Sequence, residues 1–565
     1  MHRATFVFAL VVSLFTLAAH GQGRFTVVEA SIPQMQAAMA KGQVTSRQLV
    51  EQYLMRIGIY EDRLNATLAV NPKALDDADQ LDRERAQGKL RGPLHGIPVA
   101  LKDNIHTTDM PTTGGALLFA GYIPPYEATL TTHLKAAGAI IIAKTGLTEL
   151  ANWVAGNPNA MPGNYNAVGG FAYNPYDPRP DPRADPGDGR PVLQTGGSSS
   201  GVGTAANFWA GNVGSDTGGS IISPSNANML VGIRPTIGRI SRYGVIPITA
   251  DHDTAGPMTK TVADSAIMLG AMEGASPDPH DAATRTCTPP PNRDYTRFLN
   301  TSGLKGKRIG VPRAFYIDRV TLPGETTPRG GLNPEQAKAM ADAIAVLKAQ
   351  GAVIVDPAEI PSFVAKSAND SFPLWDFCSG AEHAKGKDQN CSINFKYGMK
   401  RDYNAWLETL GPSAPVKTLK DHIEWNRAHA KAGAIKYGQS RFEISDETDL
   451  IADKARLDTD DAKDYRLSRE QGIDGVLKAH RLDAVITPGG AGAGIASRAG
   501  YPIVAVPFAM VPNAPQQAFP AGFTARPAPF GVGFVGAQCS EPVLIEIAYA
   551  FEQATKKRVP PASAP

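Results

Sequence analysis

The sequence predicts an α/β fold in which helices sandwich a large mixed, mostly parallel central sheet. Three observations lead to this prediction. Short apolar runs without alternation recur along the chain, which is typical of strands buried on both faces. Helical patterns separate these runs, as in sheets covered by helices. No internal repeat or long linker divides the 565 residues, so we expect one domain over residues 22–565.

The first residues have the pattern of an export signal. Met1-His2-Arg3 carries positive charge, residues 4–19 are nearly all apolar, and Ala19-His20-Gly21 is a candidate cleavage site. The apolar run is shorter than the roughly 20 residues of a spanning helix, which disfavours an uncleaved membrane anchor. We therefore expect a signal peptide over residues 1–21, a periplasmic or secreted mature chain, and no membrane span in it.

Helices are expected over residues 31–90, where apolar residues recur at spacings of three and four. Ser31, Thr45 and Asn71 are candidate N-caps, and Pro72 suits a first helical position. The strand candidates follow, at residues 97–101, 139–143, 308–311, 352–355 and 482–486. Helices are predicted before the second and the fourth, over residues 130–137 and 334–350.

Two segments have the composition of insertions. Residues 174–190 are rich in Pro, Asp, Arg and Gly, which predicts an exposed loop. Residues 360–470 are mixed and helical, and we expect them to form a cap over the site. The core motifs then fall within residues 92–270, and the chain returns to the core over residues 480–560.

Charge and cysteine content exclude several functions. The formal net charge is +2, from 56 basic and 54 acidic residues, so no basic patch indicates a nucleic-acid partner. No C-x-x-C and no zinc-like histidine pair occurs, so we expect no metal and no cofactor. Four cysteines in an exported chain permit disulfides. Cys378 and Cys391 could close a short loop, but the pairing of these two with Cys287 and Cys539 is open.

The segment from Gly196 to Pro257 carries the most chemical information. Glycine and serine crowd into two clusters, residues 196–203 and 214–220. Neither residue packs a core, but glycine permits positive φ and close backbone approach. The run Thr217-Gly218-Gly219-Ser220 can therefore present successive N–H groups to one concavity, as in an oxyanion hole. A glycine-rich turn without function is the plain alternative, which the presence of two clusters makes less attractive.

Two other interpretations of these clusters fit less well. A phosphate-binding loop lacks the Gly-Lys-Ser/Thr that closes such loops. Residues 197–201 formally match the nucleophile elbow G-x-S-x-G, with Ser199 as the nucleophile of an α/β-hydrolase esterase. That motif requires a strand directly before it, whereas in this chain Pro191 and the polar insertion come first.

Residues 92–270 resemble the amidase signature family, and the second half of this segment is most similar to the peptide-amidase-like branch. The resemblance covers most of the chain and is weakest across residues 275–480. The segments that carry it are GIPVALKDN at 96–104, GSS at 197–199, GGSI at 218–221, GIRPT at 232–236, AGYP at 499–502, PFGVGF at 529–534 and AYAFEQAT at 548–555. This family implies an α/β/α sandwich and metal-free hydrolysis of carboxylic amides.

The resemblance assigns roles to particular residues. Ser220 corresponds to the nucleophile that forms an acyl-enzyme, Ser198 to the bridging serine on a cis peptide bond, and Lys102 to the base. The backbone N–H groups of Thr217, Gly218 and Gly219 correspond to the oxyanion donors. Candidates for supporting roles are Ser199 and Asp216.

Lys102 has a sequence context that suits a base. An ordinary lysine has a pKa of about 10.4 and is protonated at neutral pH, but burial at the end of an apolar strand lowers that value. Lys144 also ends an apolar run, but the family pattern places the base at Lys102, so a structural part is expected for Lys144. From Ser198 to Ser220 is 22 positions, two fewer than is usual in the family, which leaves open whether residue 198, 199 or 200 bridges.

The expected reaction is hydrolysis of an amide to an acid and an amine or ammonia. Peptide C-terminal amides are the leading substrates, and aryl acylamides, fatty amides and esters remain alternatives. Export and the balanced charge argue against amidation of charged tRNA, a role of some family members. A non-catalytic binding protein on the same scaffold is the rival of another class.

Overall fold

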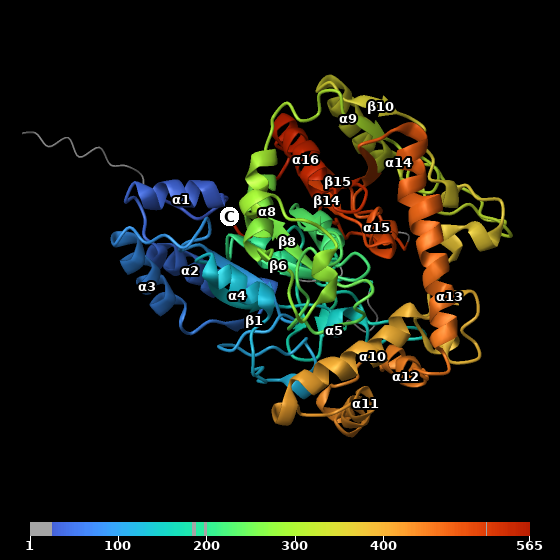
Figure 1. Cartoon of the computed structure of the whole chain (residues 1–565), viewed down its shortest axis with the longest axis horizontal. Helices are drawn as coiled ribbons and strands as arrows, with labels where there is room; N and C mark the ends of the chain where they lie inside the picture. Colours follow the sequence, from blue (N-terminus) through green and yellow to red (C-terminus); the bar gives the residue numbers. More distant parts are fainter. Residues whose placement is uncertain (1–24, 184–187, 197–199, 516) are drawn as a thin grey trace, which may run out of the picture.

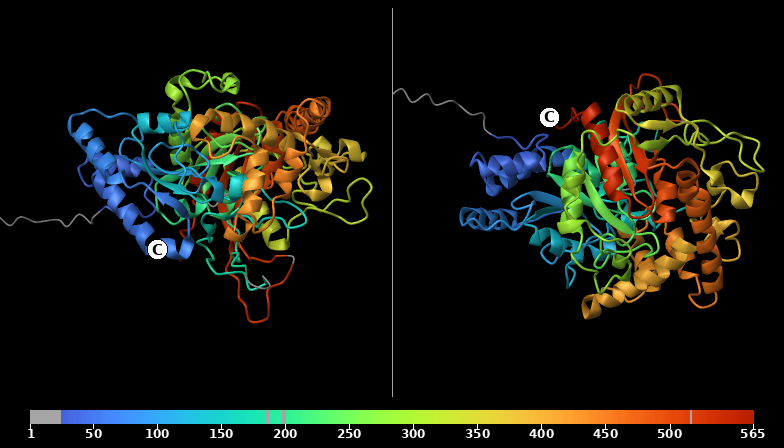
Figure 2. Two further views of the ribbon diagram at one scale, coloured as in Figure 1. Left: turned by 90° about the horizontal axis from the view of Figure 1, so that it is seen from below. Right: turned by 45° about the horizontal axis from the view of Figure 1, so that its top comes forward.

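The computed structural model describes residues 25–183, 188–196, 200–515 and 517–565 (Figure 1). The predicted signal peptide and the two serines Ser198 and Ser199 lie outside these described residues. An 11-stranded sheet runs through the centre of the described part. Helices cover both of its faces (Figure 2), so the α/β sandwich expected from the sequence is confirmed.

The spatial order of the strands in this sheet departs from their order along the chain. From one edge to the other, the strands are β1 Thr67–Val70, β3 Ile140–Thr145, β2 Pro98–Lys102, β6 Gly211–Asp216, β8 Thr254–Thr259, β7 Val231–Arg234, β14 Ile503–Val511, β15 Ala528–Val535, β13 Ala484–Pro488, β9 Arg308–Gly310 and β10 Val353–Val355. Two small sheets lie outside it, one formed by β4 Tyr165–Asn166 and β5 Gly170–Phe171 and the other by β11 Asp376–Phe377 and β12 Cys391–Ser392.

The sheet is mixed, as predicted, but it is not mostly parallel. Among its described strands, β2 pairs in parallel with β3 and β6, and β9 pairs in parallel with β10 and β13. The remaining six neighbouring pairs are antiparallel, including the whole central run from β6 to β13. An apolar run indicates that a strand is buried on both faces, but it does not indicate the direction of the strand. The prediction of a mostly parallel sheet was wrong for this reason.

The N-terminal helices begin where their capping residues predict. Ser31 and Thr45 each form a capping box, at the start of α1 Ile32–Ala40 and α2 Ser46–Leu64. Asn71 caps no helix, because α3 Ala74–Ala86 begins after Lys73 and has no side-chain cap. The Asn71 side chain instead accepts the N–H of Lys73 at 2.8 Å in the turn that follows β1.

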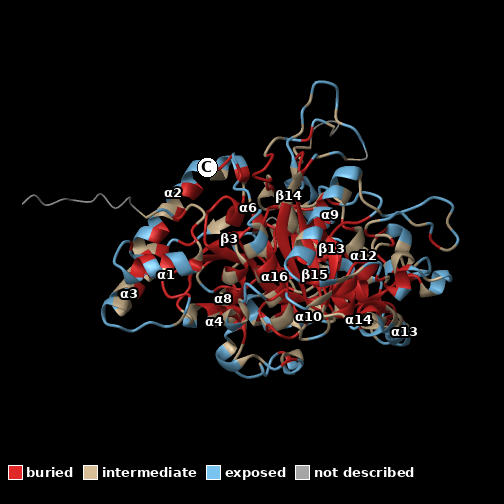
Figure 3. Ribbon diagram, turned by 90° about the horizontal axis from the view of Figure 1, so that it is seen from above, coloured by how far each residue is buried: buried red, intermediate tan, exposed pale blue. Residues whose placement is uncertain are grey.

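The remaining α-helices follow along the chain, and α10 to α13 lie within residues 360–470, the segment expected to form a cap. They are α4 Thr129–Ala136, α5 Glu149–Asn152, α6 Ser200–Ala205, α7 Ile222–Ala227, α8 Val262–Met272, α9 Pro334–Ala349, α10 Asn394–Thr409, α11 Leu419–Ala428, α12 Ser440–Asp446, α13 Lys454–Tyr465, α14 Asp474–His480, α15 Ala493–Ala499 and α16 Glu541–Thr555, with a π-helical segment over Arg466–Ile473 joining α13 to α14. Helices α10 to α13 gather on one side of the sheet (Figure 1). Buried residues concentrate in the sheet strands and in the helix faces against them (Figure 3).

The four cysteines form two disulfides, and the structure gives the pairing that the sequence left open. Cys287 pairs with Cys539, and Cys378 pairs with Cys391. Residues 174–183 and 188–190 lie beside the described part of the loop at residues 512–527 (Figure 2), where Arg179 and Arg183 stack over Phe523 and Phe519. Within the described residues, no helix has the length and apolar character needed to cross a membrane.

Candidate active site

Lys102 and Ser215 meet at the carboxyl ends of two neighbouring strands. Strands β2 and β6 are parallel, and Leu101 lies opposite Val213, so the residues that follow these two come side by side. The Lys102 Nζ lies 2.9 Å from the Ser215 Oγ and 3.1 Å from the Ser215 carbonyl oxygen. The Asn104 amide donates a second hydrogen bond, of 2.9 Å, to the same hydroxyl. Ser215 therefore holds the amine end of Lys102 through two oxygens.

The environment of Lys102 favours its neutral form. The side chain is fully buried, and this desolvation lowers its pKa to about 8, against the opposing charges of Asp216 and Asp253. Lys144, on the adjacent strand β3, serves a different cluster. It forms a buried ion pair of 3.1 Å with Asp103 and donates to the Thr112 hydroxyl at 2.7 Å.

Asp216 organises the turn that carries Ser220. One carboxylate oxygen accepts the N–H of Gly219 at 2.8 Å and the other accepts the N–H of Ile221 at 2.7 Å, so both neighbours of Ser220 are fixed. The charge of Asp216 is matched by Arg234, whose Nη1 lies 3.1 Å away, with both side chains fully buried. Because the Gly219 N–H is already bonded to Asp216, Thr217 and Gly218 are left as the predicted oxyanion donors.

Asp253 supports the same turn from the neighbouring strand. It lies directly before β8 and accepts the Thr217 hydroxyl at 2.5 Å. Its other oxygen accepts the N–H groups of Ile248 and Thr249 at 2.9 and 3.1 Å. Burial raises the pKa of Asp253 to about 7, although these hydrogen bonds oppose that shift.

Gly196, at the start of the first glycine cluster, lies directly beside α7, the helix that follows Ser220. Gly196 has a φ of +82°, and a Cβ there would lie 2.4 Å from the nitrogen of Pro224 in α7, so only glycine allows this approach. Residues 192–196 form no strand, so the nucleophile-elbow alternative lacks the element that it requires.

Ser220 opens into a pocket of about 370 Å³. Thr217 and Gly218 line it next to the candidate nucleophile, and the cap supplies much of the opposite wall. The wall is strongly aromatic. Its aromatic and charged members are Trp153, Phe372, Trp375, Phe377, Phe395, Asp376, Arg441 and Arg498.

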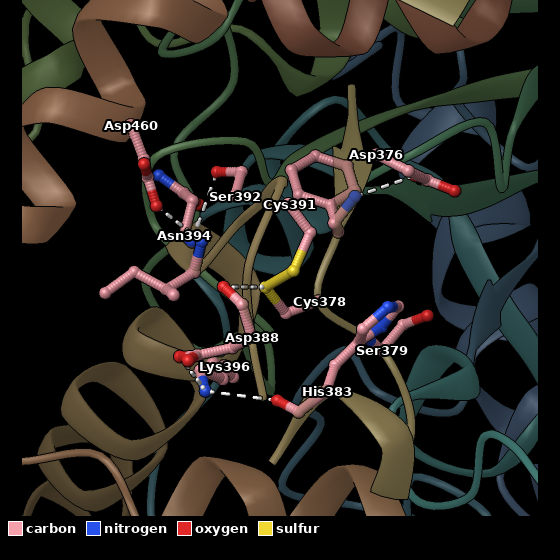
Figure 4. The surroundings of a disulfide bond; sticks show 12 residues. Asp376, Cys378, Ser379, His383, Asp388, Cys391, Ser392, Asn394, Lys396 and Asp460 are labelled. Atoms are coloured by element: carbon pink, nitrogen blue, oxygen red, sulfur yellow. Dashed lines mark hydrogen bonds and ion pairs between the residues drawn. A yellow bond between two sulfur atoms is a disulfide. The ribbon is translucent and has the colours of Figure 1, made fainter. Parts of the chain in front are cut away.

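The cap side of the pocket is fixed by covalent and polar contacts. The Cys378–Cys391 disulfide (Figure 4) links β12 to the residue that follows β11. In the sequence, Cys378 stands between the wall residues Phe377 and Ser379. The Phe377 ring stacks on Phe395 with centroids 3.6 Å apart. The Asp464 carboxylate binds Arg498 at 2.5 Å and the Trp375 indole at 2.7 Å, so these wall side chains are held in place.

The other side of the pocket contains a strained turn. Leu150, Ala151 and Asn152 all have left-handed backbone conformations, with φ of 43°, 56° and 74°. Non-glycine residues adopt this region rarely, and such strain concentrates at functional sites. The turn is held by a 2.8 Å hydrogen bond from the Leu150 N–H to the Gly114 carbonyl and by the Arg441 guanidinium, which donates to the Asn152 carbonyl.

The amidase family profile matches residues 48–545. The chain belongs to the amidase family. A probable amidase of Arabidopsis thaliana is 33% identical to it over 95% of this chain and 92% of that protein. The solved peptide amidase of Stenotrophomonas maltophilia is 33% identical, covers 95% of this chain and 99% of its own, and superposes with a TM-score of 0.77. An amidase family protein of Bacillus anthracis is 29% identical, with a TM-score of 0.77 over 95% and 92% of the two chains.

This membership confirms the resemblance found in the sequence. The chain is accordingly an amide hydrolase, which excludes the non-catalytic binding protein as the main interpretation. Several residues of the site were not anticipated. Ser215 and Asn104 lie within the glycine-rich and GIPVALKDN motifs, two residues or fewer from Asp216 and Lys102, but their contacts depend on strand register. The cap residues Trp375, Phe377 and Arg441 carry no sequence signal that points to a pocket.

Proposed function

We propose that this amidase forms an acyl-enzyme on Ser220, with Ser198 passing the proton to Lys102. The observation that carries this proposal is the hydrogen bonding of Lys102. A neutral amine has two N–H groups and one lone pair. The Ser215 carbonyl and hydroxyl oxygens accept two N–H groups from Lys102, so the lone pair remains to accept a proton from another hydroxyl.

The proton path follows from this arrangement. Neutral Lys102 takes the proton of Ser198, which in turn takes that of Ser220 as its Oγ attacks the substrate carbonyl carbon. The C–N bond then breaks while the leaving nitrogen receives the proton along the same path in reverse. Water attacks the acyl-enzyme in a second round and releases the acid.

The turn after β6 supplies the electrostatic part of the mechanism. The N–H groups of Thr217 and Gly218 are the proposed donors to the developing oxyanion. Asp216 and Asp253 hold that turn by hydrogen bonds to its backbone and to the Thr217 hydroxyl. Donors fixed before the reaction stabilise the charge without reorganisation, so these two carboxylates act by positioning.

The substrates that we propose are small amides whose acyl part packs along an aromatic wall, including peptide C-terminal amides. The aromatic wall and the volume of about 370 Å³ support this size and character. The Stenotrophomonas structure is named as a peptide amidase, and a second structure of a peptide amidase contains the competitive inhibitor chymostatin. Aryl acylamides, fatty amides and esters are alternatives on the same site.

A labelling experiment tests the mechanism. A fluorophosphonate probe should modify the wild-type protein at Ser220, as located by peptide mass analysis, and release of ammonia or amine should cease in the labelled protein. Ser220→Ala should abolish both probe labelling and amide hydrolysis, and Lys102→Met should strongly slow both reactions. Labelling at Ser199 that persists in Lys102→Met would contradict the proposal and favour the esterase alternative.

We also propose that the chain works outside the cytoplasm. Both of its cysteine pairs are disulfide-bonded, and structural disulfides persist mainly in oxidising compartments. Together with the export pattern of residues 1–21, this supports a periplasmic or secreted enzyme. Fractionation of cells that express the full chain, followed by N-terminal sequencing of the mature protein, would test both parts of this proposal.

A further inference from the structure

The pocket wall contains two arginines in different electrostatic states. The charge of Arg498 is balanced, because its Nη1 lies 2.5 Å from the buried carboxylate of Asp464. Arg441 has no such partner, since no carboxylate of the described residues lies within 4.0 Å of its guanidinium, and Asp376 and Glu382 act on it only from farther away. Arg441 is therefore the cation in this wall whose charge is not locally neutralised.

The position of Arg441 is fixed by uncharged groups. Its Nε donates to the Ser379 carbonyl at 3.1 Å, and its Nη1 donates to the Asn152 carbonyl. The guanidinium also lies over the Trp153 ring, 5.1 Å from the centroid. Within the part of the chain that the structure describes, Nη2 has no hydrogen-bond partner. An anchored guanidinium with an unused edge is suited to bind a carboxylate.

The surroundings strengthen this attraction. Burial lowers the pKa of Arg441, yet arginine stays cationic in proteins, so its charge is poorly solvated and gains from an incoming anion. Asp376 also lines the pocket, but its side chain is 90% exposed and lies nearer Arg498, at 4.0 Å. A solvated carboxylate at the rim is screened by water and salt, and it leaves most of the field of Arg441 intact.

We propose that Arg441 binds a carboxylate on the acyl part of the substrate, so that the preferred substrates are monoamides of dicarboxylic acids or amides with an acidic side chain. This inference rests on the proposed function of Ser220, because both residues line the same pocket. The amide carbonyl would lie at Ser220 and the carboxylate at Arg441, with the acyl chain along the aromatic wall. Arg441 is then a specificity residue, and it takes no part in the proton transfers.

The test compares matched substrates. Monoamides of succinic, glutaric and adipic acid are paired with butanamide, pentanamide and hexanamide, and ω-amino amides of the same lengths carry the opposite charge. In the wild type, kcat/KM for the best acidic amide should exceed that of its neutral counterpart by about tenfold or more, as a charged hydrogen bond allows. The ω-amino amides should be the poorest of each set.

Substitutions of Arg441 test whether this residue causes the preference for acidic amides. Arg441→Met should bring the acidic-to-neutral ratio close to one, and Arg441→Lys should give an intermediate ratio. The ratio is the readout, because loss of the contacts to Ser379 and Asn152 can change absolute rates. Arg427→Met, an exposed arginine of the same cap that pairs with Glu443, is the matched control and should keep the wild-type ratio.

Two results would overturn the inference while leaving the proposed function intact. One is a wild-type ratio at or below one for every chain length, with neutral amides still hydrolysed through Ser220. The other is an unchanged ratio in Arg441→Met. If no amide of any charge is turned over by the wild type, the proposed function fails first and this inference fails with it.

Discussion

The Lys102 Nζ lies 2.9 Å from the Ser215 Oγ, across two parallel strands whose carboxyl ends adjoin. This contact gives the buried lysine a fixed direction, since a second bond from Asn104 holds the same hydroxyl. The geometry of the site therefore depends on the register of β2 with β6 as well as on the glycine-rich turns. This contact, and those that hold the turn and the pocket wall, have measurable consequences.

The pH profile should report the titration of Lys102. Burial lowers the pKa of this lysine to about 8, and only its neutral form can accept a proton. Activity should therefore rise with pH and level off above about 8. Below that value, kcat/KM for a neutral amide should fall about tenfold per pH unit. A profile that is flat between pH 6 and 9, measured by amine release, would contradict the assignment of Lys102 as the base.

Ser215→Ala should lower kcat more than it changes KM. The variant removes one of the two acceptors that orient neutral Lys102, and a hydrogen bond between neutral groups contributes about 0.5–1.5 kcal/mol, or roughly 2- to 10-fold in rate. Ser215→Thr keeps the hydroxyl and should lose less. Steady-state kinetics on one amide would test this, and equal kcat values for the Ala and Thr variants would count against a positioning role.

Asp216→Asn should destabilise the fold as well as the site. The substitution leaves the buried Arg234 without its partner, and breaking a buried ion pair typically costs about 3–5 kcal/mol. It also removes one of the acceptors for the N–H groups beside Ser220. Urea unfolding should show the loss, and probe labelling of the folded fraction should be slowed. Asp342→Asn, which removes the exposed partner of Lys338, is the control and should unfold at the wild-type urea concentration.

Removal of the Cys378–Cys391 disulfide should weaken substrate binding. This bond lies between Phe377 and Ser379 in the pocket wall, so Cys378→Ser with Cys391→Ser should raise KM several-fold. The paired control is Cys287→Ser with Cys539→Ser, because neither Cys287 nor Cys539 lines that pocket. Both double variants should lose stability, by about 2–5 kcal/mol. An identical KM in the two would show that the first disulfide does not support the pocket.

Much of the fold could be predicted from the sequence. Each of the five expected strands is present, the predicted caps Ser31 and Thr45 precede helices, and the helix expected over residues 334–350 is α9. The strands that were missed include β6 and β8, whose sequences GNVGSD and TAGPMT contain glycine and proline. Such residues have low strand propensity, and only burial in the centre of the sheet makes them strands. Because neither segment was predicted to be a strand, the antiparallel pairing of β6 with β8 could not be predicted either.

The site was predicted only in part. Motif resemblance pointed to Lys102 and Ser220. The structure places Lys102 at the end of β2 and Ser220 in the turn that follows β6, while Ser198 lies outside the described residues. Ser215 could not be assigned, because its role depends on which strand lies beside β2. Arg441 comes from a cap helix more than 200 positions after Ser220, and no periodicity relates the two. Pocket composition is a property of tertiary packing.

The contact between Lys102 and Ser215 joins residues 113 positions apart, and this has a consequence for biogenesis. A newly made or unfolded chain has all of its functional groups but no base of lowered pKa, because water surrounds the lysine until β2 and β6 pair. The polypeptide should remain inert until this part of the sheet has formed. The rate at which amide hydrolysis recovers after dilution from denaturant would then measure how fast β2 and β6 pair.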